Sequence, residues 1–452
     1  MLNQFVRIMK AEGLSDMVIR TFSAYYKALV AGERGTLSQV QAPGKEQLVE
    51  YESLAGMGRQ DLLRNIAVIK LNGGLGTGMG LHKAKSLLPV KGNMTFLDII
   101  ARQILTLRAV HGYPVQLIFM NSFATQQDTL SYLEKYPELI QQELPLSFMQ
   151  NKFPRITQEA YAPFETKDKA ARWNPTGHGD LYTAITTSGI LEKLIAQGYR
   201  YAFVSNADNL GATVDTAIAA YMAKHDIPFL MEVCIRSEMD KKGGHLAMDA
   251  QSQLLLRELA QCPEEELDEF QDISRYSYFN TNNLWIDLQA LEWHMITHDN
   301  LMLLPMIVNP KTVDGTKVYQ LETAMGAAIS SFPNAKAVVV PRSRFSPVKK
   351  TNDLLAIWSD LYDLNDQYLV QLKRGLAAPP YIELDPLYYD TIEKLSQRFG
   401  AGVPSLYSCK ELIIEGDVSF GADVVCDGRV HLKAKQPVRI KNSLITGQIT
   451  YD

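Results

Sequence analysis

Hydrophobic residues in the first sixty positions recur at about the three-to-four-residue repeat of a helix. A polar break containing Pro43 and Gly44 ends this pattern. We therefore predict an N-terminal helical segment over residues 1–60. The positions of the repeat are Phe5, Ile8, Met9, Leu14, Phe22, Tyr25, Tyr26 and Leu29.

From about residue 61 the pattern changes to short apolar runs, several of them rich in β-branched residues. Segments with helical spacing, such as Phe96–Val110, lie between these runs. Alternating strands and helices predict an α/β fold with a mostly parallel sheet covered on both faces, which we assign to residues 61–380. The predicted strands are Ile66–Leu71, Gln116–Met120, Tyr201–Val204, Phe229–Val233 and Ala335–Val340.

Aliphatic residues near the C-terminus recur every six positions, with Gly416 and Gly428 at turn-like points between them. The spacing starts again after Pro437. A six-residue repeat favours a small parallel β-helix over residues 381–452, with an antiparallel meander as the alternative. The residues of the repeat are Leu412, Val418, Val424, Val430, Val438 and Leu444.

Composition limits the class of protein. The chain has 452 residues, 46% of them hydrophobic, which is enough for two or three domains with a large core. Its 45 basic and 50 acidic side chains give a net charge of -5. A general nucleic-acid binder needs a basic surface, so we expect no nucleic-acid partner.

The four cysteines and the N-terminal sequence indicate a compartment. Cys234, Cys262, Cys409 and Cys426 have neither zinc-ligand nor redox spacing, as expected of thiols in a reducing environment. The chain starts without the apolar run of a signal peptide, and no stretch approaches the ~20 apolar residues of a membrane span. We expect a cytoplasmic protein with no membrane partner.

A glycine-rich segment, KLNGGLGTGMGLHKAKS at residues 70–86, follows directly on an apolar run. It has neither the dinucleotide pattern G-x-G-x-x-G nor the P-loop spacing. Five glycines within eight residues still allow close approach of the backbone to an anion, and Lys83 and Lys85 add positive charge. We interpret the segment as a phosphate-binding loop rather than a merely flexible turn.

Polar residues follow other predicted strands, where ligands of parallel sheets bind. Asn206 and Asp208 end an apolar strand, and a carboxylate there suits Mg²⁺ beside phosphates, although a turn or cap would use the same residues. Gln150 could offer a donor and an acceptor to a base, and His178 lies between two glycines. Taken alone, each has an ordinary structural interpretation.

The glycine-rich segment resembles the signature L-x-G-G-x-G-T-x-M-G-x-x-x-P-K of UDP-sugar pyrophosphorylases, closest to the eukaryotic-type UTP–glucose-1-phosphate uridylyltransferases. Ala84 stands where that family usually has proline. Further segments agree in the expected order from about residue 60 to 360: NPTGHGDLY, SNADNL, YFNTNNLWI, YQLETAMG and RFSPVKK. The likeness continues more weakly near the C-terminus.

The resemblance implies a Rossmann-like nucleotidyltransferase domain with a small C-terminal left-handed β-helix domain. It also implies roles for individual residues. Lys85 and Lys349 would be catalytic, and Asp208 would hold Mg²⁺. The nucleotide site would comprise Leu71, Asn72, Gly73, Gly74, Lys85, Gln150, Gly177, Asn206 and Asp208, and the sugar-phosphate site would comprise His178, Gly243, Asn280, Asn282, Glu322 and Lys349.

The implied reaction joins UTP to α-D-glucose 1-phosphate and gives UDP-glucose and diphosphate. Synthesis of a UDP-N-acetylhexosamine, or broad UDP-sugar specificity, is the nearest alternative. A non-catalytic nucleotide-sugar-binding protein is a second, although it predicts loss of charged positions that are present here. Self-association through the C-terminal domain remains open.

Overall fold

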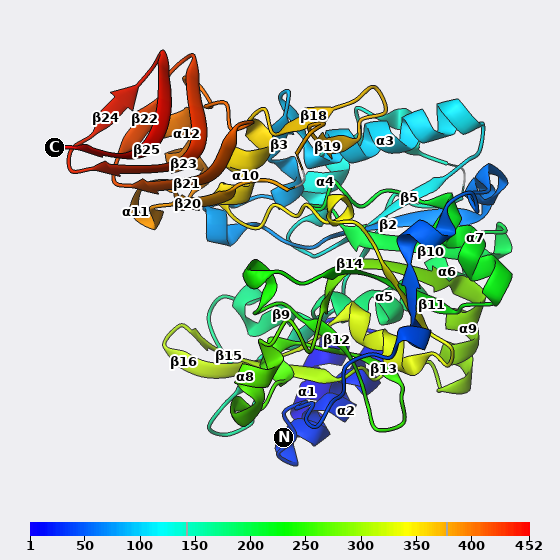
Figure 1. Ribbon diagram of the computed structural model, residues 1–452. Helices are drawn as coiled ribbons and strands as arrows, with labels where there is room; N and C mark the ends of the chain where they lie inside the picture. Colours follow the sequence, from blue (N-terminus) through cyan, green and yellow to red (C-terminus); the bar gives the residue numbers. More distant parts are fainter. Residues whose placement is uncertain (142, 377) are drawn as a thin grey trace.

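The computed structural model describes residues 1–141, 143–376 and 378–452, and a ten-stranded sheet forms the centre of this part of the chain (Figure 1). The strand β14 is antiparallel to both of its neighbours, and the other pairs along the main path are parallel. The order is β1 (Leu48–Glu50), β17 (Lys336–Val339), β11 (Phe229–Ile235), β14 (Tyr278–Asp287), β10 (Tyr201–Asn206), β2 (Ile66–Asn72), β5 (Gln116–Asn121) and β6 (Ser147–Met149), with β12 (His245–Met248) and β13 (Leu254–Arg257) beside β14.

This arrangement confirms the predicted α/β fold with a mixed, mostly parallel sheet. All five apolar runs singled out from the sequence are strands of this sheet. Every residue of β2 and of β5 is buried, because a parallel strand with helices on both faces has no solvent side. Continuous apolar runs, rather than alternating ones, are the expected result.

Helices cover both faces of the sheet (Figure 1). One face packs on α3 (Phe96–His111), α7 (Thr216–His225) and α10 (Thr351–Trp358), and the other on α5 (Leu181–Thr187), α6 (Ile190–Ala196) and α9 (Leu288–Thr297). A capping box of Thr95 and Asp98 starts α3, and Gly112 ends it in the left-handed conformation. None of the described helices is long and apolar enough to cross a membrane.

The N-terminal segment forms the predicted helices, α1 (Leu2–Ala11) and α2 (Asp16–Val30). Their aromatic side chains Phe5 and Phe22 join a separate core cluster with Phe153 of the main body. The same segment also supplies β1, which pairs in parallel with β17 at the edge of the central sheet. The helical pattern gave no sign of this strand, because β1 is only three residues long.

The C-terminal strands pair in parallel, so the antiparallel meander considered as an alternative is wrong. Leu412 lies beside Val430, and Val418 beside Val438, so residues of the six-residue repeat meet in register. The elements are β20 (Tyr381–Leu384), α11 (Pro386–Tyr389), α12 (Ile392–Phe399), β21 (Cys409–Glu415), β22 (Val418–Phe420), β23 (Val424–Ala434), β24 (Val438–Ile440) and β25 (Ser443–Tyr451).

Shorter elements surround the central sheet and carry the loops that reach its carboxyl ends. The hairpin of β15 and β16 pairs with β8, and β7 pairs with β9. These elements are β3 (Pro89–Lys91), β4 (Met94–Thr95), α4 (Gln126–Leu133), β7 (Lys152–Pro154), β8 (Ile156–Thr157), β9 (Trp173–Pro175), α8 (Leu267–Phe270), β15 (Met306–Val313), β16 (Thr316–Thr323), β18 (Tyr362–Leu364) and β19 (Val370–Leu372).

A buried ion pair lies inside the central sheet. Glu232 in β11 is fully buried, and its carboxylate accepts hydrogen bonds from Arg344 Nε at 2.8 Å and Arg344 Nη2 at 2.6 Å. Trp285 Nε1 and Asn283 Nδ2, both in β14, donate to the same carboxylate. A buried carboxylate is tolerated when its oxygens are fully paired, as they are here.

We predict that Glu232→Gln lowers the free energy of unfolding by about 3 kcal/mol, because it leaves the buried Arg344 guanidinium without its main counter-charge. Chemical denaturation measures the loss. Glu238→Gln is the matched control, since Glu238 forms an exposed pair with Lys241 and its loss should cost no more than about 0.5 kcal/mol. Equal stability of the two variants would contradict the role given to the buried pair.

Candidate active site

The carboxyl ends of β2 and β10 lie side by side and start two of the predicted motifs. Leu71 is the parallel partner of Asn206, and the Ala207 N–H donates to the Leu71 carbonyl at 2.9 Å. The glycine-rich loop therefore leaves the sheet beside the segment that carries Asp208. Two sequence motifs more than 130 residues apart meet at this point.

The start of the glycine-rich loop is fixed by side chains beneath it. Asn72 is buried, and its amide donates to Asn121 Oδ1 and Thr129 Oγ1, both at 2.8 Å. Ser122 Oγ donates to the Gly73 carbonyl at 2.8 Å. The Asn72 side chain is thus committed to the protein interior, and its position sets the path of the backbone that follows.

The loop then turns back so that Lys85 lies beside its first half. Gly76 and Gly80 have positive φ, and the Lys85 N–H donates to the Gly74 carbonyl at 3.1 Å. A Cβ at Gly76 would come within 2.9 Å of Leu81 Cδ1 and 3.2 Å of Lys85 Cγ, so a side chain there would press on both. Ala84, directly before it, is buried and donates its N–H to Asp128 Oδ2 at 3.2 Å.

Lys85 and Asp208, predicted separately, form an ion pair with 2.5 Å between Nζ and Oδ2. Both side chains are partly exposed, at 15% and 21%, so the pair faces solvent at the carboxyl end of the sheet. Asn206, which precedes Asp208, is half-buried at the end of β10. A cation and the carboxylate predicted to bind metal thus lie in direct contact.

The segment that carries Lys349 runs beside Asp208. The Val348 N–H donates to the Asp208 carbonyl at 3.2 Å. The N–H groups of Lys349 and Lys350 both donate to Oδ2 of Asp353, which lies in the first turn of α10. Burial raises the pKa of the Asp353 carboxyl, against these hydrogen bonds and the charges of Lys349 and Lys85. The charges of both predicted catalytic lysines therefore act on the Asp353 carboxyl. The Lys349 side chain is exposed.

Gln150 connects the glycine-rich loop to the segment that contains His178. Its Nε2 donates to the Gly177 carbonyl at 2.6 Å, and its Oε1 would be 3.0 Å from a Cβ at Gly73. Gly177 has φ of 78°, and a Cβ there would come within 2.5 Å of the Thr323 carbonyl oxygen. Only glycine fits this position, because the segment packs directly against the backbone of β16.

His178 is oriented by a backbone group. Its Nδ1 accepts a hydrogen bond from the Met325 N–H at 2.9 Å, so Nδ1 carries no proton. Burial lowers the pKa of His178 to about 4, so the ring is neutral near pH 7. The remaining proton lies on Nε2, which makes His178 a neutral hydrogen-bond donor. This agrees with a binding role and not with that of a charged acid.

A β-bulge presents the predicted sugar-site asparagines. The register between β11 and β14 shifts between Glu232, opposite Asn283, and Val233, opposite Asn280. Asn282 lies in the extra segment with φ of 58°, and its N–H and side chain are hydrogen-bonded to the Asn280 amide. Bulges of this kind redirect side chains at functional sites.

Gly243 and Glu322 lie beside the other predicted residues. The turn that contains Gly243 abuts Asn280, whose N–H donates to the Gly244 carbonyl at 3.1 Å. The Cβ of Glu322 lies 3.2 Å from the Cβ position of Gly177. Burial raises the pKa of the Glu322 carboxyl, against a hydrogen bond from Asn309 Nδ2. The predicted residues thus form connected groups at the carboxyl ends of the central strands.

Three supporting residues were missed from the sequence. Arg236 is buried and donates to four carbonyls, those of Phe270, Tyr276, Asp240 and Lys241, so it ties the Gly243 turn to the segment around α8. Glu258 lies against Gly244, and burial raises the pKa of its carboxyl against the opposing charge of Lys349. Glu232 stands in the otherwise apolar run LMEVCI, and that isolated charge was the one available signal.

The metal-binding capacity of the described residues is small. They contain no group of three or more His, Cys, Asp or Glu side chains placed to share a metal ion. Asp208 therefore offers a single carboxylate. This fits Mg²⁺ held by one or two carboxylates together with substrate phosphates, and does not fit a closed all-protein site.

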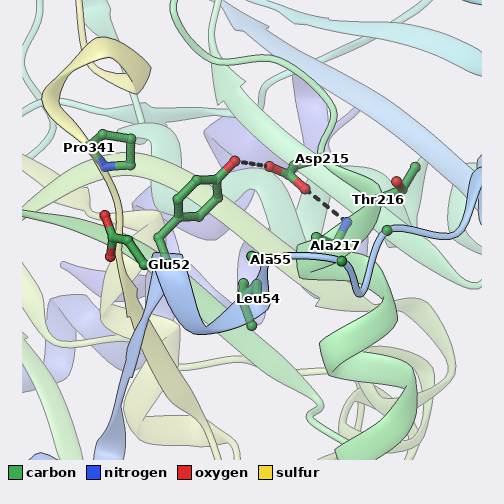
Figure 2. Close-up of a pocket in the computed structure, with 10 residues that line it drawn as sticks. Glu52, Leu54, Ala55, Asp215, Thr216, Ala217 and Pro341 are labelled. Atoms are coloured by element: carbon green, nitrogen blue, oxygen red, sulfur yellow. Dashed lines mark hydrogen bonds between the residues drawn. The ribbon is translucent and has the colours of Figure 1, made fainter.

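A cavity of about 570 Å³ lies away from these groups, between residues 51–58 and the start of α7. Glu52 and Pro341 lie on one side of it and Asp215 and Ala217 on the other (Figure 2). The Asp215 carboxylate accepts from Tyr51 O–H at 2.5 Å and caps α7 at the Ala217 N–H. None of the predicted site residues lines this cavity, so size alone does not identify the active site.

Comparison with known proteins identifies the family. A family model described as UTP–glucose-1-phosphate uridylyltransferase matches residues 18–427. The enzyme of that name from Hordeum vulgare is 39% identical, over 96% of this chain and 94% of its own length. The one from Solanum tuberosum is 41% identical, over 89% and 85%.

Comparison with solved structures gives the same family. A variant of UDP-glucose pyrophosphorylase from Leishmania major, in complex with UDP-glucose, is 42% identical with a TM-score of 0.93 and covers 99% of both chains. A UDP-glucose phosphorylase from Trypanosoma brucei is 42% identical with a TM-score of 0.89, again over 99% of both chains. On these matches, and on the motifs brought together at the ends of β2 and β10, the chain belongs to the UTP–glucose-1-phosphate uridylyltransferase family.

Proposed function

We propose that the protein catalyses the reaction of UTP with α-D-glucose 1-phosphate to give UDP-glucose and diphosphate. The observation that carries this proposal is the contact of Lys85 with Asp208, beside the segment that bears Lys349. Relatives that share nearly the whole chain bear the name of this activity. One structural relative was solved in complex with UDP-glucose.

The chemistry is an in-line attack of a sugar-phosphate oxygen on the α-phosphorus of UTP, with diphosphate as the leaving group. Both reactants are anions, so charge repulsion is a large part of the barrier, and positioning with electrostatic stabilisation lowers it. A phosphate oxygen is already ionised near pH 7 and needs no general base. The neutral state of His178 is compatible with this scheme, because His178 then acts only as a donor.

The two lysines take different parts of the reaction in this proposal. Lys85 holds the triphosphate and the departing diphosphate, and its contact with the glycine-rich loop favours that side. Lys349 is exposed on the neighbouring segment and stabilises the transferred group from the sugar-phosphate side.

We assign uracil recognition to the backbone at Leu71, Asn72, Gly73 and Gly74 together with Gln150. The position of Gln150 between Gly73 and Gly177 supports this, since its amide lies beside the glycine-rich loop. Asn206 and Gly177 complete the nucleotide side. The sugar phosphate is assigned to His178, Gly243, Asn280, Asn282, Glu322 and Lys349.

We propose Mg²⁺ as the cofactor, with Asp208 as its protein ligand. When bound, the ion neutralises phosphate charge. The exposed part of the Asp208 carboxylate and the absence of a multi-carboxylate cluster in the described residues suit an ion that takes its other ligands from phosphates and water. Lys85 balances the Asp208 charge from the other side.

We also propose the division into residues 1–60, 61–380 and 381–452, with the last part a left-handed β-helix. The parallel pairing of β21, β23 and β25 supports a helical stack of strands. Self-association through that part and a cytoplasmic location remain proposals, the latter supported by four free cysteines. Another UDP-sugar product is the alternative reaction, and a binding protein without activity is the alternative class.

We predict that the protein releases diphosphate when mixed with UTP, Mg²⁺ and glucose 1-phosphate, and that omission of any one of the three abolishes release. A coupled diphosphate assay measures this. The same assay with N-acetylglucosamine 1-phosphate and galactose 1-phosphate tests the sugar. Faster diphosphate release with either of these sugar phosphates than with glucose 1-phosphate would overturn the choice of glucose. No diphosphate release with any of the three would favour the alternative of a binding protein without activity.

Lys349→Ala and Asp208→Ala should each lower kcat by roughly 10²-fold or more, because each removes a charge that acts on the reacting phosphates. Lys350→Ala is the matched control, an equally exposed neighbour whose loss should change kcat by less than about threefold. UTP affinity is measured separately by calorimetry. Near-normal turnover of both test variants would show that the assigned roles are wrong.

A further inference from the structure

A second cavity lies beside β2 and β10, on the face covered by α3. Its volume is about 150 Å³, and it is lined by helix α3, the two strands, residues 212–214 and the loop between β18 and β19, with an open side near the exposed Val110. Its walls are mainly aliphatic and aromatic. The apolar lining residues are Val68, Ile100, Ile104, Leu107, Val110, Phe203, Ala212, Val214 and Leu369.

Two basic side chains line this cavity, those of Lys70 and His111, and Lys70 is the buried one. Lys70 is 3% exposed, and it lies on the same face of β2 as Val68 because side chains alternate along a strand. Its amino group donates to Ser205 Oγ at 2.7 Å and to the Ala212 carbonyl at 2.9 Å. An ammonium group has three donors, and the described residues provide acceptors for two.

The direct contacts of the Lys70 ammonium are two neutral acceptors and the Phe203 ring, whose centroid lies 5.6 Å from Nζ, and none of these is an anion. Burial, together with the nearby Arg344 charge, lowers the pKa of Lys70 to about 7 against the attraction of Glu232. Glu232 itself is paired with Arg344, so it is not available as a direct partner. An anion in the cavity would supply both the missing acceptor and the missing counter-charge.

The size and lining of the cavity define the ligand class. An apolar cavity of about this volume holds a single benzene ring. The apolar walls suit a ring, and the ammonium suits a carboxylate on it. We propose that this cavity is a binding site for a small single-ring carboxylate, with Lys70 as its counter-ion.

The proposed carboxylate site lies next to the candidate active site along the sequence. Lys70 directly precedes Leu71 at the start of the glycine-rich loop. Its acceptors Ser205 and Ala212 lie at the two ends of the segment that carries Asp208. A ligand on Lys70 therefore contacts the common base of both loops without occupying either, and its binding does not depend on the proposed reaction.

The test is isothermal titration of the full chain with benzoate and with benzyl alcohol, its uncharged counterpart. Benzoate should bind at least about tenfold more tightly than benzyl alcohol, because only the carboxylate pairs with Lys70. Saturating UTP should leave benzoate binding in place, which separates this cavity from the phosphate site. Absence of benzoate binding, equal affinity for the two probes, or displacement by UTP would overturn the proposal.

Substitutions in and near the cavity test where benzoate binds. Leu107→Trp fills the cavity from α3 and should abolish benzoate binding, whereas Ala109→Trp, at an exposed position on the same helix, should bind as the wild type does. Lys70→Met keeps the length of the side chain and should remove the preference for benzoate over benzyl alcohol. Unchanged binding by Leu107→Trp, or a retained preference in Lys70→Met, would place the ligand elsewhere. Circular dichroism of each variant checks folding.

Discussion

The buried pair of Glu232 and Arg344 is the constraint on which the geometry of the site depends. Arg344 follows β17 and stands five residues before Lys349, and its buried charge is paired with Glu232 of β11. Its carbonyl also accepts from the amides of Asn209 and Asn283. One residue thereby joins the lysine segment, the Asp208 segment and β14. The energetic penalty for burying two charges is offset only while these partners stay in place.

The rest of the site is built from backbone and from a few charges at its edge. The glycine-rich loop offers main-chain groups because its side chains are absent or turned inward, as that of Asn72 is. Lys85 and Lys349 then give local positive charge in a chain with a net charge of -5. Local placement and not overall charge decides whether an anion binds, since exposed charges beyond about 10 Å are screened.

The sequence was sufficient for five of the ten strands of the central sheet and for the motifs that follow them, because a parallel sheet requires continuous apolar runs and places ligands at one edge. It could not indicate that Lys85 touches Asp208, since that contact depends on how the loop folds back through Gly76. It also could not show that the Asn72 side chain points inward, or that Arg236 donates hydrogen bonds to four carbonyls in two segments. Such roles arise from tertiary contacts between distant residues. The short strand β1 was missed for a related reason, because three residues give no periodicity.

Ala84 has a consequence for the temperature range in which the glycine-rich loop stays ordered. Its φ of -51° is one that proline also adopts, and the resembling signature has proline here. A proline ring restricts the unfolded chain as well as the folded one, and this effect is entropic. Ala84 instead ties the loop to α4 through the hydrogen bond from its N–H to Asp128, which proline could not donate. Warming breaks a hydrogen bond but leaves a ring intact, so this loop should loosen at a lower temperature than one held by proline.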